Sequence, residues 1–269
     1  MEVQIPEAGD AEDVADRLTR AHGALELHAA LLALLLPAGS RRAEKAWKIE
    51  TAGAPGAEGL RKHVASLSGA ARLPWFELLL KRMTAQPIAA RQELLQATRR
   101  VMSARGVARP IDRLHWLCMR RGLGEVAPLA ARPEANVEVA EWLESDVLAI
   151  ATYTAFLSRM IPDEKAEGTA WYDSVMETWQ PFAAIPSCEP PPTETMVESL
   201  NRLQTLSWMQ RPLVVRYWLT AATQQSRGGR LGDLAADALR MTCDLLDSPH
   251  PPDLARHYVA LSADAEKLV

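Results

Sequence analysis

The residues that come closest to a chemical motif lie at two glycine breaks, Ser103–Gly106 and Ser226–Gly229, each between two predicted helices. The stretches that precede them, 87–98 and 212–223, share a proline, an arginine four residues later and an Ala-Thr pair. With acidic side chains, such loops would supply the oxygen ligands that a hard cation needs. Both breaks carry an arginine instead, so we expect no metal in either loop.

The common catalytic motifs are missing from the sequence. No two of the six histidines are four residues apart, so the His-Glu-x-x-His motif of zinc peptidases is absent. Neither a Gly-x-Ser-x-Gly nucleophile motif nor a phosphate-binding Gly-Lys-Ser or Gly-Lys-Thr occurs. We therefore expect a protein that is not an enzyme and that uses no cofactor and no small-molecule substrate.

The elements that carry these residues are predicted to be helices. Ala, Leu and Arg dominate, whereas valine, isoleucine, phenylalanine and tyrosine are sparse. The pattern predicts an all-α bundle of about ten to twelve helices, including one from Asp10 to about Leu36 and a long one over 134–160. A proline-rich linker at 185–193 precedes a helix at about 194–207.

Charge divides the chain into two predicted lobes, 1–124 and 125–269. Residues 37–121 hold 17 basic and six acidic side chains, whereas residues 122–269 hold 11 basic and 21 acidic ones. One interpretation is that the two lobes neutralise each other. The other is that the basic lobe presents a face to an anionic partner. Opposite charges also permit head-to-tail self-association into a homo-oligomer.

The sequence also bears on localisation. The longest apolar run, Leu27–Leu36, is about half the roughly 20 residues that a membrane crossing needs. The three cysteines are widely spaced, which is typical of reduced thiols. We expect a cytoplasmic protein without a membrane span.

Basic residues and tryptophans are the candidate contacts for a partner. Solvated helix faces would explain most of the basic residues, and a pI near 5.9 argues against nucleic acid. Trp75, Trp171 and Trp179 fall near predicted helix ends, where an indole can anchor a partner, although the core is the better assignment for each. We expect Trp116, Trp142, Trp208 and Trp218 in the core. The predicted partner-binding residues are Arg99, Arg100, Arg105, Arg109, Arg120, Arg121 and Trp75.

Several short motifs resemble a known family. They include Arg72–Leu78, Pro87, Gly106, Leu114 and the stretch 246–252. Over roughly residues 25–255, the chain resembles the TerB-like helical C-terminal region of bacterial HtpX-type membrane zinc peptidases, without the peptidase domain. The resemblance implies a degenerate internal TerB-like repeat.

The chain departs from the family pattern at the residues that would bind a cation. That pattern has an aspartate at each break and a glutamate in the next helix. Here the aspartate positions hold Arg105 and Gly228, and the glutamate positions hold Asp112 and Ala235. Three of these four carboxylates are therefore missing.

Three functional hypotheses follow. The first is a non-catalytic adaptor or scaffold that binds an acidic protein surface; the resemblance implies a membrane-associated or stress or defence assembly. The second is a TerB-like divalent-cation module, which requires Asp112, Asp233 and Asp237 to converge with backbone carbonyls. The third is an enzyme whose type the motifs do not reveal, which a buried cleft with a shifted carboxylate or histidine would indicate.

Overall fold

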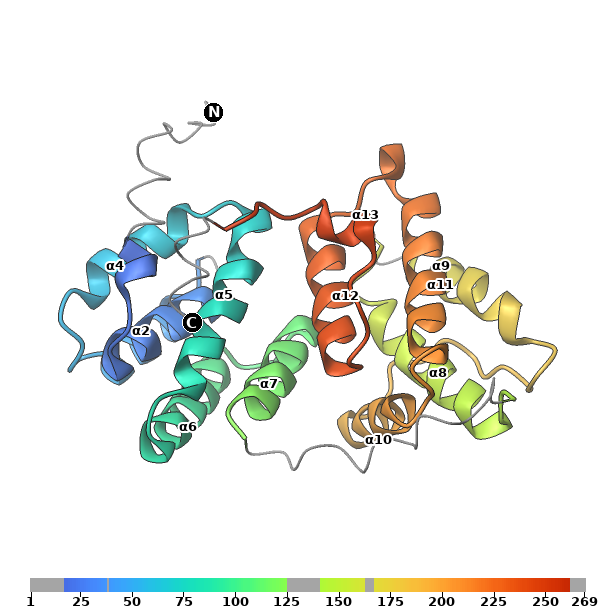
Figure 1. Ribbon diagram of the computed structural model, residues 1–269, viewed down its shortest axis with the longest axis horizontal. Coiled ribbons are helices and arrows are strands. Elements are labelled where there is room, and N and C mark those ends of the chain that lie inside the picture. Colours follow the sequence, from blue (N-terminus) through green and yellow to red (C-terminus); the bar gives the residue numbers. More distant parts are fainter. Residues whose placement is uncertain (1–16, 38, 125–140, 163–166, 262–269) are drawn as a thin grey trace. The chain divides into compact units, whose positions relative to one another are not determined.

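The computed structural model describes residues 17–37, 39–124, 141–162 and 167–261 (Figure 1). Within these ranges the regular structure is helical and no strand occurs, so the predicted all-α fold with about ten to twelve helices is confirmed. The chain divides into two compact units. Unit 1 comprises Met1–Leu123 with Tyr258–Val269, and unit 2 comprises Gly124–His257. The structure thus differs from the expected lobes in grouping the end of the chain with the first unit.

Unit 1 is built from the helices α2 (Ala24–Leu35), α3 (Arg41–Glu50), α4 (Ala57–Ser66), α5 (Gly69–Thr84), α6 (Ile88–Ala104) and α7 (Pro110–Gly122). The central helix is α2, which packs against α3, α4, α5 and α6. Its residues from Leu27 to Leu35 are all buried, because a helix that is apolar on every side needs neighbours on every side. Trp47 of α3 fixes one neighbour by donating from Nε1 to the carbonyl of Ala29 (3.2 Å).

The predicted helix from Asp10 to Leu36 is interrupted, and its first residues lie outside the described ranges. The chain is helical over 17–20, leaves the helix and re-enters it at Ala24 after Gly23. Arg82 of α5 is buried and donates from Nη1 to the carbonyls of Leu18, Thr19 and Ala21 (3.1, 3.0 and 3.3 Å). A distant guanidinium therefore binds carbonyls that a continuous helix would have used internally.

Unit 2 is built from the helices α8 (Glu144–Leu157), α9 (Gly168–Met176), α10 (Thr193–Gln204), α11 (Gln210–Gln225), α12 (Asp233–Leu245) and α13 (Pro252–Ala255), with two 3-10 turns, η2 (Glu177–Trp179) and η3 (Arg227–Gly229). Helix α8 lies beside α10, and α11 packs against α9 and α12 (Figure 1). The predicted linker has no helix from 184 to 192, and Tyr172 anchors it by donating to the carbonyl of Pro186 (2.7 Å).

Buried polar contacts join the helices of unit 2. Trp218 of α11 donates from Nε1 to the hydroxyl oxygen of Thr154 on α8 (2.8 Å). The hydroxyls of Tyr153 on α8 and Thr242 on α12 lie 3.1 Å apart. All four side chains are fully buried, and the partners they find avoid the cost of burying a polar atom without a hydrogen bond.

The predicted helix over 134–160 is described only in part, because residues 134–140 lie outside the described ranges. Residues 141–143 are not helical, and α8 starts at Glu144. Asp146 caps this start by accepting from the backbone N–H of Leu143 (3.2 Å). No helix in the described ranges is both long and apolar enough to cross a membrane.

Both predicted helix–glycine–helix stretches are confirmed. Helices α6 and α7 are separated at Gly106, which has φ = +95°, and α11 and α12 are separated at Gly228 and Gly229, with φ = +73° and +69°. Glycine suits these positions because side chains rarely tolerate a left-handed backbone. The resemblance to a TerB-like repeat stays a prediction.

Candidate functional site

The predicted partner-binding arginines on α6 are engaged within unit 1. The guanidinium of Arg99 lies 4.7 Å from the ring centroid of Trp116 on α7. Arg100 donates to both carboxylate oxygens of Glu50 and to Glu93, each at 2.7 Å. These hydrogen bonds raise the pKa of Arg100 and lower that of Glu50. Both arginines therefore join helices of one unit.

Two further predicted arginines surround one buried carboxylate at the first glycine break. Arg105 donates to both oxygens of Asp112 (3.1 and 3.0 Å), and Arg109 adds a side-chain contact at 3.1 Å. The backbone N–H of Arg109 also donates to Asp112 (2.8 Å), which caps the start of α7. The Asp112 and Arg105 side chains are only 5% and 10% exposed. The carboxylate of Asp112, which a bound cation would need as a ligand, is therefore already paired with the guanidinium of Arg105.

The described residues do not assemble a metal centre. No group of three or more His, Cys, Asp or Glu side chains within them could hold a metal ion. Asp112 lies on α7, whereas Asp233 and Asp237 lie on α12, and Asp233 pairs with His257 (3.1 Å). The carboxylates required by the cation hypothesis already have other partners.

The remaining predicted arginines, Arg120 and Arg121, are half-buried in the last turn of α7 and have interactions of their own. The tryptophans require corrections, because Trp75, expected at a partner surface, is buried, and because Trp116 and Trp142, expected in the core, are only half-buried. Trp75 is only 3% exposed in α5, so its indole does not lie on the surface, and Trp171 and Trp179 are equally buried. Trp208, expected in the core, is 66% exposed and is followed by Met209 at 53%.

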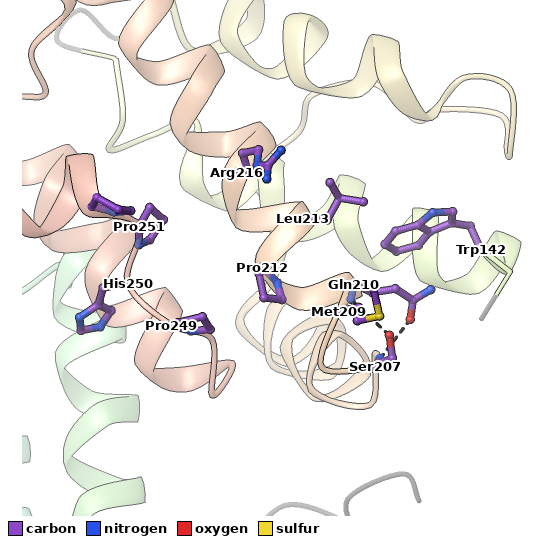
Figure 2. A pocket seen from close by; sticks show the side chains of 11 residues that line it. Trp142, Ser207, Met209, Gln210, Pro212, Leu213, Arg216, Pro249, His250 and Pro251 are labelled. Carbon is purple, nitrogen blue, oxygen red and sulfur yellow. Dashed lines mark hydrogen bonds between the residues drawn. The ribbon is translucent and has the colours of Figure 1, made fainter. Parts of the chain in front are cut away.

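A pocket of about 580 Å³ lies beside this exposed pair in unit 2. Figure 2 shows α11 in its centre, with the Pro249–Pro251 segment on one side and Trp142 on the other. The lining residues are Trp142, Ser207, Met209, Gln210, Pro212, Leu213, Arg216, Pro249, His250, Pro251 and Pro252. The size and the apolar lining are those of a typical binding pocket.

A capping box fixes the base of the pocket. The backbone N–H of Ser207 donates to Oε1 of Gln210 (3.0 Å), and the backbone N–H of Gln210 donates to Oγ of Ser207 (3.2 Å). This reciprocal pair is marked by dashed lines in Figure 2. It ties down the turn in which Trp208 and Met209 lie exposed. The Ser-x-x-Gln spacing was the local signal for this turn.

The turn that ends α12 forms the opposite wall. The N–H of Ser248 donates to the carbonyl of Cys243 (2.9 Å), and that of Asp247 donates to Asp244 (3.2 Å), with Asp247 at φ = +50°. This is the Schellman arrangement, which usually places glycine where Asp247 stands. Arg211 of α11 donates to the carbonyl of Leu246 and so ties the turn to the base of the pocket.

Replacing Asp247 by glycine is expected to raise the free energy of unfolding of unit 2 by about 0.5–1 kcal/mol. Glycine adopts the left-handed backbone conformation of residue 247 without the steric strain that a side chain causes there. The change also removes a negative charge at a helix C-terminus. Asp247→Asn removes only the charge and should recover part of the gain. Urea unfolding of the three proteins measures both effects, and a lower stability of the glycine variant would contradict the argument.

Trp142 is held in place by an aromatic cluster. It packs edge-on against the buried Trp179 with ring centroids 4.6 Å apart, and Trp179 in turn contacts Tyr217 of α11 (5.6 Å). Four residues after Trp142, Asp146 forms an ion pair with Arg202 of α10 (2.7 Å). The indole of Trp142 is therefore held by packing against Trp179 and lies half-exposed at one end of the pocket.

The chemistry of the lining suits binding. Arg216 is its only guanidinium, and no carboxylate lines it. His250 Nε2 lies 2.8 Å from Asp244, and the Ser207 hydroxyl takes part in the capping box. Apolar surface with one cation can bury an apolar group that carries an anion. Comparison with protein-family models, curated proteins and solved structures finds no match for this chain.

Proposed function

We propose that the protein is a non-catalytic helical adaptor that binds another protein through a docking face on unit 2. This docking face consists of Trp208, Met209 and the adjoining pocket. The observation that carries the proposal is the large exposure of Trp208 and Met209 directly beside an apolar pocket. Tryptophan in such a setting is a frequent energetic centre of protein interfaces.

The exposure of the pair is enforced by local structure. The capping box constrains the turn that carries both residues, so they are not simply part of a loose loop. Exposed apolar surface next to a concave pocket marks an interaction site more often than a scattered apolar residue does. The arginines first expected at the interface stabilise unit 1, which moves the proposed contact to unit 2.

The cellular setting is also a proposal. Cys118, Cys188 and Cys243 form no disulfide in the described part of the chain, which suits a reducing compartment such as the cytoplasm. The family resemblance of the short motifs supports a partner in a membrane-associated or stress or defence assembly.

Replacing Trp208 or Met209 by serine is expected to weaken partner binding at least tenfold and to change unfolding stability by less than about 0.5 kcal/mol. A photo-crosslinker at Leu213, in cells that express the protein, would capture the partner. Quantitative mass spectrometry then compares its recovery between wild type and variants.

Leu234→Ser provides the matched control. Leu234 is another exposed apolar residue of unit 2, at 47%, and it does not line the pocket. Its replacement should leave the crosslinked partner unchanged. If the Trp208 and Met209 variants recover as much partner as this control, the docking face is not used and the proposal fails.

A further inference from the structure

We infer that the pocket on unit 2 recognises an acidic apolar segment of the partner protein, with a large apolar side chain in the pocket and a carboxylate at Arg216. The inference rests on the proposed docking function and specifies its chemistry. It starts from the juxtaposition of an uncommitted guanidinium and an apolar, proline-rich lining.

Arg216 is available for an external anion. It is exposed, and no described residue forms an ion pair or hydrogen bond with its side chain. The other arginine at this end of α11, Arg211, instead donates to the carbonyl of Leu246. A guanidinium prefers a carboxylate because its planar fork of donors matches two oxygens.

The other lining groups favour an apolar side chain next to that carboxylate. Trp142, Met209, Leu213 and four prolines supply apolar surface on both sides of α11 (Figure 2). A volume of about 580 Å³ has room for a large side chain and its neighbours. The imidazole of His250 faces Asp244, so it does not compete with Arg216 for the anion.

The net charge of unit 2 opposes acidic ligands at long range, since Gly124–His257 holds 19 acidic and 10 basic residues. At physiological salt, exposed charges are screened beyond about 8 Å. The nearest charge therefore decides recognition, and within the lining that charge is Arg216. A carboxylate of the partner that is not next to Arg216 therefore finds no guanidinium in the pocket lining.

A displayed library of random 12-residue peptides tests the inference with purified full-length protein. Selection on wild type should enrich peptides with Leu, Phe or Trp close to Asp or Glu. For a selected peptide, replacing its acidic residue by the corresponding amide should weaken binding about threefold to tenfold. The same replacement should have no effect on Arg216→Gln protein, because the guanidinium that reads the charge is gone.

Arg230→Gln is the matched control, since Arg230 is an exposed arginine of unit 2 that does not line the pocket. It should retain the full preference for the acidic peptide. The inference would be overturned if selection did not enrich acidic residues. It would also be overturned if replacing the peptide's acidic residue by its amide weakened binding to Arg216→Gln protein as much as to wild type. Neither result would argue against the docking face. Peptides that bind the Trp208→Ser and Met209→Ser variants as well as wild type would reject the docking face itself, and a selection without binders would reject both.

Discussion

Asp112→Ala is expected to lower the free energy of unfolding of unit 1 by about 3–5 kcal/mol, the usual cost of removing one partner from a buried ion pair. The change leaves the guanidinium of Arg105, only 10% exposed, without its bidentate carboxylate. It also removes the acceptor that caps α7 at the N–H of Arg109. Both losses act at the junction of α6 and α7. Guanidinium chloride unfolding followed by circular dichroism measures the change.

Two comparisons separate the causes. Asp112→Asn keeps an acceptor for the Arg109 N–H but loses the charge. Its free energy of unfolding should therefore lie between those of wild type and Asp112→Ala. Asp253→Ala removes an exposed ion pair with Arg256, whose side chains are 72% and 80% exposed, and should have little effect. If Asp112→Ala were as stable as Asp253→Ala, the buried pair would not hold the junction.

The second large effect is a loss of stability with falling pH that depends on His115. This half-buried imidazole packs edge-on against Phe76, and its Nδ1 lies 3.1 Å from the carbonyl of Ile111. Burial lowers its pKa from 6.5 to about 4, although Asp112 acts in the opposite direction. Above pH 6.5 the imidazole is neutral in both states. Between pH 6.5 and 4 only the unfolded chain binds the proton, so the free energy of unfolding falls.

His115 alone should account for about 2 kcal/mol of lost stability between pH 6.5 and 4.5. Chemical unfolding at a series of pH values, on wild type and His115→Gln, measures the difference in slope. His22→Gln, at an exposed position of the same unit, controls for the exchange of a histidine for glutamine. Burial also lowers the pKa of His28, so the His115 variant should retain part of the acid sensitivity. Equal slopes for wild type and His115→Gln would contradict the assignment.

The sequence predicted the features that depend on neighbouring residues. The all-α fold and the two helix–glycine–helix stretches follow from composition and from glycine and proline punctuation, which act within a few residues. The arginine at each glycine break was also visible in the sequence, but the ion pair between Arg105 and Asp112 was not.

The features that sequence reasoning missed depend on distant partners. Arg100 meets Glu50 across 50 residues, so a run of basic residues could not reveal which members were engaged. The early helix is broken because Arg82, more than 60 residues away, binds its carbonyls. Trp208 follows the buried Leu206 and looks like a core residue by pattern. Only the capping box around it indicates a helix start, where side chains can remain outside.

The prolines of the pocket have a consequence for the cost of recognition. Four of its eleven lining residues, Pro212, Pro249, Pro251 and Pro252, have a ring-locked φ. A flexible loop loses conformational entropy when a partner orders it, whereas the φ angles of these prolines are already restricted before a partner binds. Binding would then require little rearrangement of the pocket, and the shape of the partner would decide whether it is accepted.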